Sequence, residues 1–315
     1  NVATGQDDQV LLGKEYVQRW YTDLRGEPRI GQGRYDRSKE KWYLTIRDAQ
    51  DNKWREHDEY PDLDADVDIY GFTENLNELI IGAYNGKNTL GLYIYDLSAK
   101  KQTRELFHND KYDVSAPVFS NDGSKVIGAT YVADSPETVI FEDEHSGSIL
   151  EKMRNKYEGY HVKYVSESPE SDKMIFTISS PQDPGALMIY DEKLGGASLL
   201  SAMRPDILAS DIGQTIPVSY TARDGESIPA YVTLPVSITE TSQLKNLPFI
   251  VWPHGGPYAR QSLEFDYFAQ FFATRGYGVL QMNFRGSAGY GKTFKEAGRE
   301  NWVVMQEDVE DGTRW

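Results

Sequence analysis

The sequence predicts repeated antiparallel β-sheets in its first two-thirds, followed by a domain in which strands alternate with helices. A turn-and-strand pattern that begins at Phe72 recurs at Phe119, roughly 47 residues later, and more loosely at Val165. A strand, a glycine-rich loop, a helix and a second strand follow one another between residues 248 and 282. A length of 315 residues suits about two domains.

Each repeat combines a polar turn with two apolar strands, the second of which ends in acidic residues. The second strands are Leu92–Asp96, Val139–Asp143 and Leu187–Asp191, and Tyr35–Arg47 fits an earlier, more divergent repeat. A period of this length with several strands is typical of β-propeller blades. A β-sandwich is the alternative, but a sandwich has no reason to repeat its turn at a fixed interval. We therefore expect a partial β-propeller with several four-stranded blades over residues 1–212.

The second domain is expected over residues 213–315. It opens with a predicted hairpin, Pro217–Pro235, that turns at Asp224-Gly225, and residues 236–247 form a polar connection. An apolar strand follows at residues 248–252.

Residues 262–275 are then predicted to form an amphipathic helix that ends before Gly276. Its apolar face is expected to consist of Phe265, Phe268, Ala269 and Phe272. A second strand follows at residues 277–282. Right-handed crossover requires the two strands to be parallel, with the helix packed on their sheet.

The loop after the first strand of this unit reads His254-Gly255-Gly256-Pro257. Adjacent glycines let the main chain approach a ligand without a Cβ in the way, and the proline fixes the exit of the loop. In α/β-hydrolases a glycine-rich loop at this place supplies one N–H of the oxyanion hole. The sequence therefore predicts an α/β-hydrolase domain.

Four motifs in this order resemble the prolyl oligopeptidase family of serine peptidases, in its acylaminoacyl-peptidase and dipeptidyl-aminopeptidase branch. They are His254–Pro257, Arg275–Tyr277, Asn283–Gly291 and Asp308–Gly312. The resemblance implies a seven-bladed propeller and hydrolysis of short or acylated peptides by acyl transfer to a serine. The chain would hold the late blades and the first part of the hydrolase domain.

The resemblance also assigns roles to residues. The main-chain N–H of Gly256 would be a catalytic oxyanion donor, because the second glycine has this role in acylaminoacyl-peptidase-like members. His254, Gly255 and Arg285 would line the substrate. Relatives with a proline-specific pocket carry a tyrosine in place of His254, and its hydroxyl donor is absent here.

Three interpretations compete with these roles. His254 resembles a catalytic base in isolation, but a residue that shapes the loop or lines the substrate fits its position better. Arg285 either grips a peptide carbonyl or holds the loop in place. Asp308, Glu310 and Asp311 are predicted to lie on a last helix, where acidic residues are most simply a solvated face.

The sequence contains no Gly-x-Ser-x-Gly nucleophile elbow, which a serine hydrolase of this fold requires. Ser287 comes nearest, but Arg285 stands where the first glycine should be. In the family the elbow follows a helix of the type seen at Asp308–Trp315. We therefore expect a domain truncated before the elbow, without the catalytic Ser, Asp and His, and inactive alone.

The composition excludes several other classes of function. There are 33 Lys and Arg against 49 Asp and Glu, and the net charge of −16 repels nucleic acid and anionic lipid. We predict neither as a partner. The absence of cysteine excludes disulfides and a cysteine nucleophile. Five histidines without ligand spacing, and an Asp62–Asp68 run without the EF-hand glycine, predict no metal and no cofactor.

The chain begins at an asparagine, so we expect the natural N-terminus to have been removed. Periplasmic and cytoplasmic locations both fit, as does a homo-oligomer of the full-length protein. Two other functions remain open from the sequence. A carboxylesterase would use the same glycine loop, and a non-enzymatic propeller binding protein would explain the first domain alone.

Overall fold

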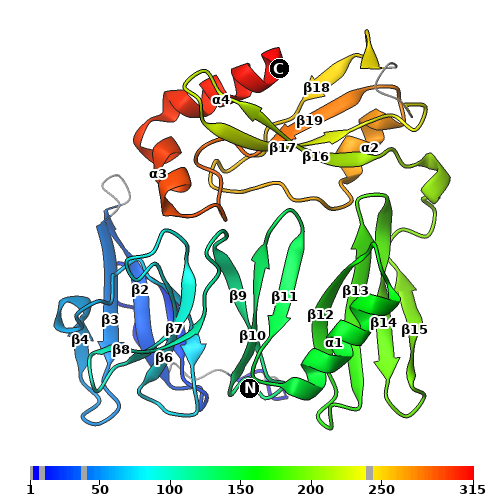
Figure 1. Ribbon diagram of the computed structural model, residues 1–315. Coiled ribbons are helices and arrows are strands. Elements are labelled where there is room, and N and C mark those ends of the chain that lie inside the picture. Colours follow the sequence, from blue (N-terminus) through cyan, green and yellow to red (C-terminus); the bar gives the residue numbers. More distant parts are fainter. Residues whose placement is uncertain (1–2, 7–10, 37–40, 239–243) are drawn as a thin grey trace. The chain divides into compact units, whose positions relative to one another are not determined.

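The structure is a computed structural model that describes residues 3–6, 11–36, 41–238 and 244–315. The chain divides into two compact units, shown together in Figure 1. Unit 1 is Asn1–Ala83, Gly91–Phe107 and Asp122–Lys125, and unit 2 is Tyr84–Leu90, His108–Asn121 and Val126–Trp315. Among the described helices, none is long and apolar enough to cross a bilayer. The predicted domain boundary after residue 212 stays a prediction.

Unit 1 contains two four-stranded antiparallel sheets in which neighbouring strands are consecutive in the chain. The first sheet consists of β1 (Val17–Thr22), β2 (Pro28–Asp36), β3 (Lys41–Arg47) and β4 (Trp54–Glu56). The second consists of β5 (Asp68–Phe72), β6 (Glu78–Ala83), β7 (Gly91–Asp96) and β8 (Lys101–Phe107). One hydrophobic core joins both sheets and includes Ile46, Phe72 and Tyr93.

Unit 2 begins with two more antiparallel sheets. The first consists of β9 (Val114–Phe119), β10 (Val126–Val132) and β11 (Pro136–Ile140), and the second of β12 (His161–Glu167), β13 (Lys173–Ser180), β14 (Asp183–Asp191) and β15 (Gly196–Ala202). The predicted repeat is confirmed, because its polar turns join β5 to β6, β9 to β10, and β12 to β13.

The sheet β9–β11 differs from the prediction, since it has three strands and is followed by a helix, α1 (Glu144–Lys156). The strand expected to run to Asp143 ends at Ile140, because the Asp143 side chain accepts a hydrogen bond from the Ser146 N–H at 3.0 Å and caps the helix. Figure 1 shows α1 lying along the sheet β12–β15. There Leu150 and Met153 are buried against the core of that sheet.

The α/β part of unit 2 is a four-stranded sheet of order β16-β17-β19-β18. Its strands are β16 (Thr215–Thr221), β17 (Ser227–Thr233), β18 (Phe249–Val251) and β19 (Gly278–Met282). The predicted hairpin is confirmed by the antiparallel pairing of β16 with β17. The predicted parallel pair is confirmed as well, with Ile250 opposite Val279 in β18 and β19. Helices α3 (Lys292–Glu300) and α4 (Trp302–Arg314) follow.

The crossover helix α2 (Tyr267–Ala273) is shorter than predicted. It starts late because the Asp266 side chain accepts a hydrogen bond from the Ala269 N–H at 2.8 Å, so Phe265 lies outside the helix. The predicted apolar face is partly wrong, since Ala269 is buried but Phe268 is 58% exposed.

Gln270 determines the rotation of α2 about its own axis. Its side chain is buried and makes two hydrogen bonds of 2.9 Å, one with the N–H and one with the C=O of Gly213. These bonds direct the Gln270 side of α2 to the protein interior. The rings of Phe268 and Phe272 lie instead 5.8 and 5.6 Å from the ring of Trp252, at the end of β18. The predicted polar connection at 236–247 lies partly outside the described residues.

Candidate active site

Two loops meet at one edge of the α/β sheet. The loop 254–257 follows β18 and the loop 283–291 follows β19, and the carboxyl ends of parallel neighbours lie side by side. The Trp252 N–H donates to the Leu280 carbonyl at 2.8 Å, which extends the pairing to the start of the first loop. The structure therefore brings His254, Gly255 and Gly256 beside the Asn283–Gly291 motif.

Gly256 occupies a position that only glycine suits. Its φ is +130°, and an added Cβ would lie 2.8 Å from the Tyr258 nitrogen and 2.9 Å from the Ala259 nitrogen. Around Gly255, by contrast, a Cβ would meet open space. Within the described part of the chain the Gly256 N–H donates to no acceptor, and the residue is exposed. The Gly256 N–H therefore has no protein acceptor in this part of the chain.

His254 is fixed on both sides of its ring. Its Nε2 lies 2.8 Å from the Ser287 hydroxyl, its Nδ1 lies 3.0 Å from the Gly255 carbonyl oxygen, and its ring stacks on Phe284 with centroids 4.5 Å apart. Burial lowers the pKa of His254 below its ordinary value, which favours a neutral imidazole near pH 7. The ring therefore has defined partners within the loops.

Asn283 joins the loop 283–291 to Gln261, in the segment that follows the loop 254–257, and this role was not predicted. The fully buried side chain accepts from the Gln261 N–H at 2.7 Å and donates to the Gln261 carbonyl at 3.1 Å and the Tyr290 hydroxyl at 2.7 Å. The signal in the sequence was a polar residue placed directly after an apolar strand.

Arg260 follows the loop 254–257 and connects this segment to the turn between β10 and β11. Its role was not predicted either. The guanidinium donates to the carbonyls of Val132 and Ala133 at 3.0 and 2.7 Å, and to the Tyr290 hydroxyl at 2.9 Å. A Cβ at Gly289 would lie 2.4 Å from the Arg260 Nη1, so this glycine makes room for the guanidinium.

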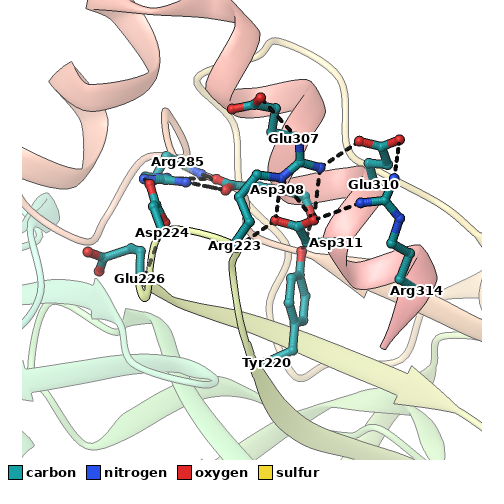
Figure 2. A network of polar contacts seen from close by, with 10 residues as sticks. All are labelled: Tyr220, Arg223, Asp224, Glu226, Arg285, Glu307, Asp308, Glu310, Asp311 and Arg314. Carbon is teal, nitrogen blue, oxygen red and sulfur yellow. Dashed lines mark hydrogen bonds and ion pairs between the residues drawn. The ribbon is translucent and has the colours of Figure 1, made fainter.

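Arg285 lies in an ion-pair network with Asp308 and Asp224 (Figure 2). Its Nη2 lies 2.6 Å from Asp308 Oδ1, its main-chain N–H donates to Asp308 Oδ2 at 2.9 Å, and its Nη1 contacts Asp224. The hydrogen bonds that Arg285 donates to Asp308 raise the pKa of its guanidinium above the ordinary value. These contacts hold the loop, which is the second of the two roles considered for this residue. A substrate-lining role stays a prediction.

The interpretation of the last helix as a solvated acidic face is wrong for two of its three residues. Asp308 is fully buried, and Asp311 is bound by the main chain and guanidinium of Arg223, with a side chain only 9% exposed. Figure 2 shows Arg223 among the carboxylates of α4. Gly312 lets Tyr220 approach, because a Cβ there would lie 2.8 Å from the ring. Only Glu310 is exposed as expected.

Comparison with known proteins agrees with these motifs. A family model described as the prolyl oligopeptidase family matches residues 263–315. Dipeptidyl aminopeptidase BIII of Pseudoxanthomonas mexicana is 28% identical over 86% of this chain and 40% of its own length. Dipeptidyl peptidase family member 6 of Caenorhabditis elegans is 25% identical over 81% of this chain and 37% of its own length. The C-terminal part of the chain is thus similar to the prolyl oligopeptidase family, and most of the chain aligns with two dipeptidyl peptidases.

Solved structures share the fold of this chain. A puromycin hydrolase aligns over 93% of the chain and 45% of its own length, with a TM-score of 0.61 and 18% identity. The acylaminoacyl peptidase of Pyrococcus horikoshii aligns over 90% of the chain and 43% of its own, with a TM-score of 0.57 and 16% identity. The fold is a set of propeller blades followed by an α/β-hydrolase part. The chain spans less than half the length of each of these relatives.

The two glycines of the loop give a matched test of its geometry. We expect Gly256→Ala to destabilise unit 2 by about 1–3 kcal/mol, because alanine is strained at φ +130° and its Cβ meets main-chain nitrogens. Gly255→Ala has open space and should change the free energy of unfolding by less than about 1 kcal/mol. Urea unfolding followed by tryptophan fluorescence measures both. Equal destabilisation by the two variants would contradict the described loop.

The ion-pair network gives a second test. Asp308→Asn should lower the free energy of unfolding by about 3–5 kcal/mol, because it leaves the buried Arg285 without its main counter-charge. Glu310→Gln removes a carboxylate of the same helix that is exposed, and it should leave stability nearly unchanged. If calorimetry gives both variants the same melting temperature, Asp308 is not the buried partner described.

Proposed function

We propose that the full-length protein is a serine peptidase that hydrolyses short or acylated peptides by a Ser-Asp-His mechanism. In this proposal the Gly256 N–H, within the present chain, supplies one donor of the oxyanion hole. The observation that carries it is the main-chain N–H of Gly256, an exposed residue, which lacks an acceptor among the described residues. The segment that follows its loop is held at Arg260 and Gln261. Relatives named as dipeptidyl aminopeptidase and acylaminoacyl peptidase support the choice of substrate.

Peptide hydrolysis by a serine requires a hydrogen-bond donor at the position of the Gly256 N–H. When a serine attacks a peptide carbonyl, negative charge develops on the carbonyl oxygen, and a fixed N–H stabilises it without reorganisation. One such donor is worth roughly 10² to 10³ in rate. The second N–H of the hole belongs to the residue after the nucleophile.

Other residues of the loop take supporting roles in this proposal. His254 and Gly255 border the bound peptide beside the Gly256 N–H. Arg285 lies at the site as well, and its main role is to hold the loop that follows β19. The propeller acts as a filter that admits short chains and excludes folded proteins. Peptides are then the partners of the full-length protein.

The nucleophile provides the first test. A fluorophosphonate probe should label the full-length protein stoichiometrically and should leave the 315-residue chain unlabelled, since this sequence has no nucleophile elbow. Loss of the nucleophile in a triad enzyme costs about 10⁶ in kcat. The full-length protein should also cleave aminoacyl arylamides. Activity on esters alone would identify a carboxylesterase instead, and labelling of the 315-residue chain would overturn the assignment.

The position of Gly256 provides the second test. In a crystal structure of the full-length protein with a peptide boronate, we expect the Gly256 nitrogen about 2.7 to 3.1 Å from the oxygen that mimics the oxyanion. If the His254 ring makes this contact and the Gly256 nitrogen faces away, the donor has been assigned to the wrong group.

A further inference from the structure

We propose that Ser287 and His254 form a positioning pair that fixes the orientation of the Gly255–Gly256 peptide. Ser287 holds the His254 ring in the tautomer that carries its proton on Nδ1, and this N–H binds the Gly255 carbonyl. The proposal rests on the proposed role of Gly256 as oxyanion donor and adds residues that act through it.

The geometry of one peptide unit is the starting point. The Gly255 carbonyl oxygen, 3.0 Å from His254 Nδ1, belongs to the same peptide as the Gly256 N–H. This peptide is trans, so its C=O and N–H point in opposite directions. A bond from the ring to the carbonyl therefore directs the N–H away from the ring. Polarisation along the chain of hydrogen bonds also strengthens the N–H as a donor.

The bond to Gly255 requires a proton on Nδ1, since a carbonyl oxygen only accepts. In a neutral imidazole Nε2 is then an acceptor and needs a donor. The Ser287 hydroxyl lies 2.8 Å from Nε2 and is fully buried. Ser287 can therefore donate its hydroxyl proton to Nε2, which selects the required tautomer.

Among the described residues, one other acceptor lies within hydrogen-bond distance of the Ser287 hydroxyl, the Phe284 carbonyl at 2.6 Å. That carbonyl already accepts the Ser287 main-chain N–H at 3.0 Å. If the hydroxyl donated to Phe284, Nε2 would carry the proton and the Nδ1 lone pair would face the Gly255 oxygen at 3.0 Å. Each tautomer leaves one pair of acceptors face to face, either the Ser287 and Phe284 oxygens at 2.6 Å or Nδ1 and the Gly255 oxygen at 3.0 Å. The Phe284 oxygen keeps the Ser287 main-chain N–H as a donor in both cases, whereas the Gly255 oxygen has no other donor among the described residues. We therefore assign the proton to Nδ1.

The ring has little freedom to leave this arrangement. It stacks on Phe284 with centroids 4.5 Å apart and planes 17° from parallel. Phe284 is itself buried between Asn283 and Arg285, whose side chains are bound to Gln261 and Asp308. The loop 283–291 thus sets the ring plane and holds Nε2, while Nδ1 meets the Gly255 carbonyl of the loop 254–257.

The tautomer of His254 can be measured on the 315-residue chain, because the measurement does not require catalytic activity. With ¹⁵N-labelled histidine, NMR near neutral pH should show His254 protonated on Nδ1. Ser287→Ala removes the donor to Nε2 and should raise the Nε2–H fraction of His254. The matched control is Ser135→Ala, because Ser135 makes the same contact with His161 Nε2, at 2.9 Å, in the blade part of unit 2. It should leave His254 unchanged. An Nε2–H tautomer of His254 in the unaltered chain would overturn the proposal.

The consequence for catalysis is measured in the full-length protein with two near-isosteric variants. The amide of His254→Asn can place a donor where Nδ1 lies, whereas His254→Gln places it near Nε2. We expect His254→Gln to lower kcat by about 10²-fold with KM changed less than about threefold, approaching the loss of an oxyanion donor. His254→Asn should retain at least about tenfold more kcat than His254→Gln, and Ser287→Ala should lose roughly tenfold.

The NMR and kinetic experiments distinguish failure of the proposed function from failure of the positioning role. If the full-length protein hydrolyses no peptide in any form, the proposed function fails, and the NMR result alone decides whether Ser287 sets the tautomer. If it is active and the Asn and Gln variants lose kcat equally, or lose only KM, the positioning role is overturned.

Discussion

The buried ion pair between Arg285 and Asp308 joins three parts of the hydrolase region. Arg285 begins the turn after β19, Asp308 lies on α4, and Asp224 of the β16–β17 turn contacts the same guanidinium. A buried charge is stable only when nearly all its hydrogen bonds are satisfied, and Asp308 accepts from both the main chain and the side chain of Arg285. The loop after β19 therefore starts from a fixed point. Two residues close to Arg285 in the sequence then make contacts outside this loop: Ser287 with His254, and Asn283 with Gln261.

The glycine loop depends on this fixed neighbour because it has little structure of its own. Gly255 and Gly256 have no side chains with which to hold a conformation, and the loop is held through Asn283, Ala288 and the Arg260 guanidinium. Side chains of the adjacent loop and carbonyls of a blade turn thus define where a main-chain amide points. This arrangement suits a site that needs a rigid donor without a bulky group beside it.

The sequence could predict the features that depend on local chemistry. The repeat of the blade turns, the hairpin around Asp224-Gly225 and the parallel pair β18 and β19 follow from apolar patterns and turn residues. Features set by tertiary partners could not be predicted. The burial of Asp308 depends on Arg285, 23 positions earlier, and the rotation of α2 depends on a bond from Gln270 to Gly213. The α1 helix was missed because a strand with an acidic exit and a helix with an aspartate cap share their residues at Asp143.

The order of strands in the α/β sheet also bears on how the chain is made. Among the described strands, β18 pairs only with β19, which follows it after a crossover that contains α2. At synthesis rates of about 5–20 residues per second, β18 emerges from the ribosome roughly 1.5–6 s before β19 does. The β16–β17 hairpin can form in that time. The free edge of β17 stays unpaired until β19 takes its place between β17 and β18. Assembly of this sheet is therefore timed by the arrival of one central strand.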